Sequence, residues 1–162
     1  MSRAYGFISF IGVFAILMLT GCGTRYIQDT KIEYTKEKAE LAKIVRAYRD
    51  ALRDKDIETL EKMTSDRYYE NASTTTDATD DYGRNGLQKV FADLKNTVRK
   101  VEVTLVIKDI VIMGDRARVD VEYDAKYLLA LGEQDRWETR NDKNRITFRK
   151  DQEGEWRISG GL

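Results

Sequence analysis

Apolar residues recur at helical spacing in three parts of the chain. Over residues 36–52 they fall three and four positions apart with charged residues between them, which predicts an amphipathic helix with Thr35 as its N-cap. Asp56 can cap a second, shorter helix. Asn85 and Gln88 match a capping box at the start of a third helix. The pattern therefore predicts three helices in this part of the chain.

Between the second and third helices, residues 65–83 mix polar, β-branched and aromatic side chains without a period. This pattern predicts irregular backbone with one short strand near Tyr68 and Tyr69. Three aspartates between residues 77 and 81 lack the alternate-residue spacing of a calcium loop. Their spacing favours a solvated turn, and no metal site is expected.

In the last third of the chain the hydrophobic period becomes two. Residues 101–107 and 117–125 alternate apolar and polar side chains on either side of a turn at Gly114 and Asp115. This predicts a long antiparallel hairpin with one buried face. Third and fourth strands are predicted at residues 136–149 and 155–159.

Asp109 interrupts the alternation in the first of these strands. With uninterrupted alternation its carboxyl group would point inward between Ile107 and Val111, where burial would raise its pKa and make it a candidate general acid or base. Ile110 and Ile112 supply an equally good inward face after a one-residue slip. The favoured interpretation is therefore a β-bulge that leaves Asp109 in solvent.

Trp137 raises a similar question in the third strand. It occupies an odd position, whereas Ile146 and Phe148 occupy even ones. One face of the strand can hold all three side chains only if a bulge separates them.

The first 22 residues have the pattern of an export signal. Arg3 is followed by an apolar run over residues 5–19, which is the length of a signal-peptide core and marginal for a membrane span. Leu19, Thr20 and Gly21 precede Cys22, the only cysteine of the chain. This stretch resembles the lipobox of bacterial lipoproteins, in which the cysteine is acylated and the signal is removed in front of it. An incidental cysteine, or an uncut apolar anchor, are the alternatives.

The resemblance to lipoproteins divides the chain into three parts. Residues 1–21 are predicted to be the signal peptide, residues 22–35 the lipidated Cys22 and a free tether, and residues 36–162 the domain. Membrane lipid is the implied partner, since two or three acyl chains hold a protein on a bilayer essentially permanently. Gly23 stands where lipoproteins of the inner membrane carry Asp, so the resemblance implies the outer membrane facing the periplasm, or the outer face of the cell membrane if the cell has one membrane.

Composition excludes several chemistries. The chain has 162 residues with 28 basic and 28 acidic side chains, and it contains no histidine. Serine and cysteine triads that need histidine are therefore excluded, and a single cysteine cannot form an internal disulfide. Residues 136–150 are rich in basic side chains, but mixed acidic residues there indicate a charged outer sheet surface rather than a nucleic-acid site. No cofactor-binding motif occurs, and no cofactor is expected.

The order of the elements resembles a known superfamily. The junction at residues 54–57, the helix entry at 83–87, the hairpin at 110–119 and the closing strand at 154–159 are similar to nuclear transport factor two, ketosteroid isomerase and the SnoaL-like cyclases. The resemblance covers residues 36–162. It implies an α+β fold of three N-terminal helices packed on a curved antiparallel sheet, a cone-shaped, cystatin-like roll with a pocket at its open end.

The resemblance implies a pocket, and aromatic residues are the candidates to line it. These are Tyr68, Tyr69, Tyr82, Tyr123, Tyr127, Trp137 and Trp156. Enzymes of the superfamily use an Asp, alone or with a His, together with an acid such as Tyr. The absence of histidine excludes the dyad and leaves Asp109 as a weak candidate acid or base.

We therefore expect an envelope lipoprotein that binds a small apolar or amphipathic ligand, or a protein partner, without catalysis. The partner could be a second copy of the chain or another envelope protein. Two alternatives stay open. One is an isomerase or dehydratase with an Asp and Tyr pocket, and the other is a structural subunit of an envelope assembly.

Overall fold

The computed structural model describes residues 24–71, 81–132 and 134–162. The predicted signal peptide and Cys22 lie outside the described residues. The helices are α1 (Lys36–Asp54), α2 (Ile57–Met63) and α3 (Arg84–Thr97). The strands are β1 (Tyr69–Glu70), β2 (Tyr82–Gly83), β3 (Val98–Met113), β4 (Arg116–Leu131), β5 (Gln134–Lys150) and β6 (Trp156–Gly160).

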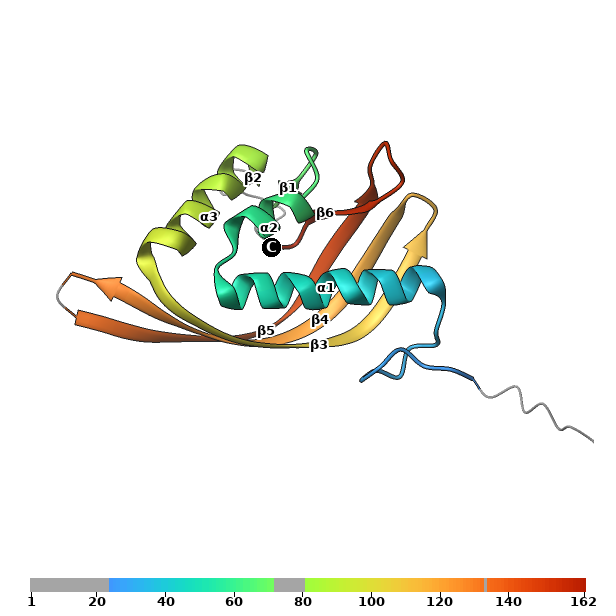
Figure 1. Ribbon diagram of the computed structural model, residues 1–162, viewed down its shortest axis with the longest axis horizontal. Helices are drawn as coiled ribbons and strands as arrows, with labels where there is room; N and C mark the ends of the chain where they lie inside the picture. The colour runs from blue at the N-terminus through green and yellow to red at the C-terminus, as the bar shows by residue number, and fades with distance from the viewer. Residues whose placement is uncertain (1–23, 72–80, 133) are drawn as a thin grey trace, which may run out of the picture.

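Strands β3, β4, β5 and β6 form one antiparallel sheet in that order, and β1 pairs with β2 in a small second sheet. Figure 1 shows that the large sheet is curved and that all three helices lie on its concave side. The predicted α+β fold is confirmed. Its core is built from inward side chains of the strands and from the buried faces of the helices, and the largest fully buried members are Phe148, Leu41, Leu60, Leu87, Ile110, Ile146 and Ile158.

The first two helices begin where the sequence predicts. The Thr35 hydroxyl accepts a hydrogen bond from the Lys38 amide at 3.1 Å, and the Asp56 carboxylate accepts one from the Thr59 amide at 3.1 Å. Each cap satisfies an amide that has no partner within its own helix. Among the described residues, no helix is both long and apolar enough to cross a bilayer.

The predicted cap of α3 is wrong. Asn85 lies within the first turn, and Gly83 is the N-cap without a side-chain hydrogen bond. Because β2 pairs with β1 up to Gly83, the chain enters the helix directly from this sheet. Gly86 allows this close turn, since a Cβ there would lie 2.5 Å from the Cβ of Tyr82. Tertiary pairing therefore fixes the start of α3.

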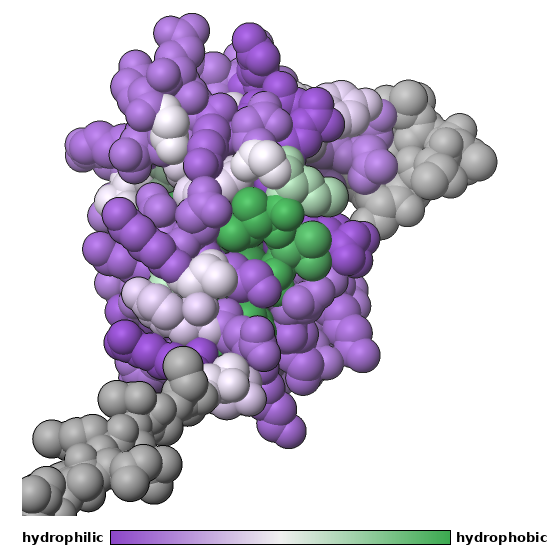
Figure 2. All heavy atoms as spheres, turned by 90° about the vertical axis from the view of Figure 1, so that its right-hand side faces the viewer, coloured by the Kyte–Doolittle hydropathy of each residue, from purple (hydrophilic) through white to green (hydrophobic). Residues whose placement is uncertain are grey.

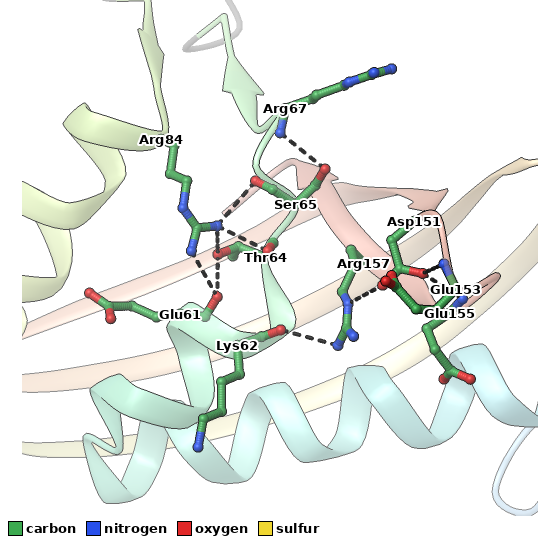
Figure 3. A network of polar contacts seen from close by, with 10 residues as sticks. All are labelled: Glu61, Lys62, Thr64, Ser65, Arg67, Arg84, Asp151, Glu153, Glu155 and Arg157. Atoms are coloured by element: carbon green, nitrogen blue, oxygen red, sulfur yellow. Dashed lines mark hydrogen bonds and ion pairs between the residues drawn. The ribbon is translucent and has the colours of Figure 1, made fainter.

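An arginine clamp connects α3 to the end of α2. The guanidinium of Arg84 donates to the carbonyls of Thr64 at 3.0 Å and Ser65 at 3.2 Å, and to the Thr64 hydroxyl at 3.0 Å. It also donates to the Glu61 carbonyl at 3.4 Å. Figure 3 shows these bonds converging on one side chain, while the Arg67 side chain points away. Arg84 thus joins α3 to the last turn of α2 and to the two residues that follow it, and it is the donor to the Thr64 carbonyl.

The predicted bulge in β3 is confirmed. The register with β4 shifts between Ile107 and Asp109, and Ile110 becomes the next buried residue at 1 % exposure. Asp109 is exposed, and its carboxylate accepts a hydrogen bond from the Ile110 amide at 2.8 Å. The prediction of Asp109 as a candidate acid or base is therefore wrong, because its carboxyl group lies in solvent.

Trp137 lies on the outer face of the sheet. Strand β5 pairs with β4 without a register shift, so Trp137 opposite Leu128 and Ile146 opposite Val119 point to different faces. The Trp137 side chain is 47 % exposed, and the Lys100 ammonium lies 5.8 Å from its ring centre. The prediction that Trp137 lines the pocket is therefore wrong.

Residues 25–34, predicted as part of a free tether, form a packed turn, which we call the N-terminal turn. Tyr26 and Glu33 pair as an antiparallel bridge, and Ile27 and Ile32 are only 4 % and 8 % exposed. Arg46 of α1 donates a hydrogen bond to the Gln28 carbonyl. Burial of two isoleucines holds this segment on the domain. The predicted tether is wrong over these residues.

Candidate functional site

A cavity of about 770 Å³ lies between α1, α3 and the concave face of the sheet. Its apolar wall includes Leu52 of α1, Phe91 and Leu94 of α3, and Val103 and Leu105 of β3. The volume falls within the range of pockets that bind small organic molecules. Figure 1 shows that α3 lies over the half of the curved sheet where β3 begins and β4 ends.

Four tyrosines supply much of the polar lining, and they come from three parts of the fold. Tyr48 lies on α1, Tyr82 on β2, and Tyr123 and Tyr127 on β4. Tyr82 donates a hydrogen bond to the Leu162 carbonyl at 3.3 Å. Within the described residues, no hydrogen bond is made by the hydroxyls of Tyr48, Tyr123 and Tyr127. These three hydroxyls are therefore available to a ligand.

The environment keeps Tyr48 and Tyr127 protonated. Burial raises the pKa of Tyr48 well above its ordinary value of about 10, and the neighbouring Tyr127, Tyr123 and Tyr82 raise it further. Burial also raises the pKa of Tyr127, with a second contribution from Tyr123. Since these hydroxyls influence one another, they share one region of the cavity. At neutral pH Tyr48 and Tyr127 therefore act as neutral hydrogen-bond donors, not as bases.

The raised pKa of Tyr48 predicts a loss of stability at alkaline pH. The folded state keeps its proton above about pH 10, where the unfolded state releases it, so the stabilisation present below pH 10 falls by about 1.4 kcal/mol per pH unit. We expect Tyr48→Phe to reduce the slope of unfolding free energy against pH above about pH 10 in urea titrations, and to leave the slope below about pH 9 unchanged. Tyr26→Phe, at a position 53 % exposed, is the matched control. An unchanged slope in Tyr48→Phe would contradict the assignment.

Charged side chains at the cavity include both signs. Arg49 and Arg140 are the basic ones, and Asp93 and Glu138 the acidic ones. Arg49 pairs with Asp50 at 2.9 Å, and Asp93 is exposed. In the part of the chain that the structure describes, no cavity carboxylate bonds to a tyrosine hydroxyl, and no cluster of three acidic or cysteine ligands could hold a metal ion.

Of the seven aromatic residues predicted to line a pocket, the structure places Tyr82, Tyr123 and Tyr127 at the cavity. Tyr69 is 57 % exposed and lies elsewhere. Tyr68 and Trp156 are each 3 % exposed and belong to the core. The prediction that Tyr68, Tyr69 and Trp156 line the pocket is therefore wrong, as it is for Trp137.

The core roles of Tyr68 and Trp156 have separate causes. The Tyr68 hydroxyl donates to Glu70 at 3.1 Å and accepts from the Leu162 amide at 3.2 Å, so it helps to fix the last residues of the chain. Trp156 lies inward on β6, with the Lys150 ammonium 4.8 Å from its ring centre. Both side chains are held by the protein itself.

Tyr48 is one of the apolar-face residues in the helical pattern over residues 36–52, and this pattern predicts only that it faces the core. Leu52 lies one helical turn after Tyr48. This spacing indicates that the two side chains lie on the same face of the helix and border the same space. Phe91 and Leu94 of α3 are three residues apart, and this spacing likewise places both on one helix face, which lines the cavity. What the spacing does not show is that the space between these helices and the sheet is partly empty.

Comparison with known proteins supports the fold and leaves the function open. No protein-family model matches the chain, and no curated protein matches it. A ketosteroid isomerase-like protein from Erwinia carotovora atroseptica is similar in structure, with a TM-score of 0.63, 17 % identity, and coverage of 79 % of this chain and 95 % of that one. A conserved protein from Planctomyces limnophilus also has a TM-score of 0.63, with 17 % identity and coverage of 77 % and 92 %.

A nuclear transport factor two-like superfamily protein from Salmonella enterica serovar Typhimurium has a TM-score of 0.61 at 13 % identity, with coverage of 76 % of this chain and 87 % of that one. The fold is therefore the nuclear transport factor two-like cone. At these identities the likeness shows the fold alone, and the function must be argued from the cavity.

Proposed function

We propose that the protein is a lipid-anchored envelope protein whose cone-shaped domain binds a small, flat amphipathic ligand without transforming it. The observation that carries the proposal is the cavity of about 770 Å³, in which an apolar wall faces three tyrosine hydroxyls without partners among the described residues. A hydroxyl that lines an apolar cavity and has no protein partner can donate to a ligand, and that hydrogen bond adds affinity and specificity.

The lining indicates how such a ligand would be held. Phe91 and Leu94 present apolar surface to one side of the cavity, and Val103 and Leu105 present it from the sheet. Burial of a flat apolar body between these walls would supply most of the affinity. An acceptor oxygen directed at the Tyr48 and Tyr127 hydroxyls would fix its orientation. The ligand class is thus a ring or chain of carbon with one oxygen acceptor.

The enzymatic alternative needs an unpaired general base inside the cavity. One structural neighbour is named as ketosteroid isomerase-like, and this makes isomerase chemistry the natural alternative. Tyr48 and Tyr127 have raised pKa values and stay protonated. Asp109 is solvated and Asp93 is exposed. Glu138, the other acidic side chain at the cavity, pairs with Arg136 at 2.5 Å. A general base must lie within hydrogen-bond reach of the proton it removes. These observations favour binding over catalysis.

The lipid anchor in this proposal is supported by the pattern of residues 19–22, where Cys22 follows a hydrophobic residue and two small ones. Cys22 itself lies outside the described residues. Intact-mass analysis of the mature chain, purified from the membranes of a bacterium that processes lipoproteins, tests the anchor. We expect a chain that begins at Cys22 and carries the mass of the acyl groups. An unmodified Cys22, or a retained leader, would contradict it.

The ligand is tested by native mass spectrometry of residues 24–162 purified from their own cell envelope. We expect a co-purifying small molecule, and a Kd about tenfold weaker in Tyr127→Phe because one hydrogen bond is lost. Tyr69→Phe removes an equivalent hydroxyl from a 57 % exposed side chain and should leave the Kd unchanged. A second subunit in place of a small molecule would favour the protein-partner alternative. Turnover of the bound molecule would overturn the non-catalytic role.

A further inference from the structure

The N-terminal turn, residues 25–34, sets the distance between the domain and an anchor at Cys22. Ile27 and Ile32 are buried, the Tyr34 amide donates to the Arg25 carbonyl at 2.7 Å, and Arg46 of α1 holds the Gln28 carbonyl. The turn is therefore part of the folded domain from its first paired residue.

Only three residue steps separate Cys22 from Arg25. A fully extended chain spans at most about 3.6 Å per residue, so the turn can lie no farther than about 11 Å from the acylated cysteine. A free tether from Gly23 to Thr35 would instead reach about 45 Å. The packed turn thus removes most of the freedom that the sequence pattern predicts for the domain.

The turn presents side chains suited to the headgroup region. Tyr26 and Tyr34 are 53 % and 42 % exposed, and the Arg25 guanidinium lies 4.5 Å from the Tyr34 ring centre. Tyrosine prefers the membrane interface, where its ring is partly apolar and its hydroxyl stays wet. Residues 24–36 carry three basic and two acidic side chains, a net charge of 3 − 2 = +1, so the contact does not depend on anionic lipid.

The fold places this turn away from the cavity. Figure 1 shows the blue N-terminal segment at the end where β3 turns into β4, whereas α3 covers the opposite end of the sheet. Figure 2 views the former end and shows hydrophilic side chains around a small apolar patch. This surface is typical of contact with a headgroup layer rather than insertion into the bilayer core.

We infer that the N-terminal turn rests on the lipid headgroups, with Tyr26 and Tyr34 at the interface, and that the cavity end of the cone is directed away from the bilayer. The inference rests on the lipid anchor of the proposed function. It gives the domain a fixed orientation, in which a ligand reaches the cavity from the aqueous side.

Site-directed fluorescence on the acylated full chain tests this orientation. Because acylation occupies the only native cysteine, Gln28→Cys and Lys126→Cys can each be labelled at one position with an environment-sensitive dye. Both native side chains are exposed, and Lys126 lies in the half of β4 that borders the cavity. The labelled proteins are reconstituted in phosphatidylcholine vesicles that contain a headgroup-attached nitroxide quencher.

We expect the dye at residue 28 to lose about half of its emission and the dye at residue 126 less than about a tenth, since the interface is only 5–10 Å deep. Tyr26→Ser with Tyr34→Ser should lower the quenching at residue 28. Equal quenching at both positions in an acylated chain would overturn the orientation and leave the anchor intact. Labelling of the unsubstituted chain at Cys22 would show a free thiol and overturn the anchor, and with it the orientation.

Discussion

Trp156→Ala is expected to destabilise the domain by about 3 kcal/mol. Trp156 is 3 % exposed and packs inward from β6, so truncation removes a large buried surface and leaves a cavity. The Trp156 indole N–H has no hydrogen-bond partner among the described residues, and the loss of this unsatisfied donor offsets part of the cost. Urea unfolding followed by circular dichroism measures the change in the free energy of unfolding.

Trp137→Ala is the matched control, with the same substitution at a side chain that is 47 % exposed on the outer face. We expect it to change the free energy of unfolding by less than about 1 kcal/mol. Trp156→Phe should stay within about 1.5 kcal/mol of the native protein, because most of the ring volume is kept. A larger loss in Trp137→Ala than in Trp156→Ala would contradict the register of β5.

Arg84→Ala is expected to cost about 2–3 kcal/mol, because it removes the hydrogen bonds that join α3 to the end of α2 and leaves the Thr64 carbonyl without a donor among the described residues. Arg84 bonds to the carbonyls of Glu61, Thr64 and Ser65 from a side chain that is 29 % exposed. The loss should appear in urea unfolding, and also as faster hydrogen exchange at the end of α2.

Two further variants separate the geometry of the Arg84 clamp from its charge. Arg84→Lys keeps the positive charge but lacks the planar fork, so we expect about half of the loss to remain. Arg67→Ala removes an equal charge from an exposed residue whose side chain points away from the network (Figure 3), and it should change stability by less than about 0.5 kcal/mol. If Arg67→Ala is as costly as Arg84→Ala, net charge and not the clamp explains the effect.

The sequence predicted the start of a helix or the position of a bulge correctly where an interaction between neighbouring residues determines it. The caps at Thr35 and Asp56 were correct because each cap bonds to an amide three residues away. The bulge at Asp109 was correct because the parity of the neighbouring isoleucines changes there. The cap at Asn85 was wrong, since pairing between β1 and β2 decides where the third helix begins.

The candidate site was only partly predictable. Parity placed Tyr123 on the buried face of its strand, and Tyr127 was predicted only as one of the aromatic candidates. Both lie at the cavity. Parity could not show that Tyr68 lies in the core and Tyr82 at the cavity, because residues 65–83 have no hydrophobic period. Tyr48 was assigned to a helix core, and only the assembled fold shows that this core contains a cavity.

The sequence by itself determined the α+β class, the two faces of the long strands and the absence of histidine chemistry, because these follow from side-chain type and from periods of two and 3.6. Only the tertiary structure decided which aromatics meet at the cavity and that residues 25–34 pack on the domain. Both outcomes depend on contacts between segments far apart in the chain. No hydrophobic period in the sequence predicts the burial of Ile27 and Ile32. These side chains are buried only because the folded domain provides a surface that covers them.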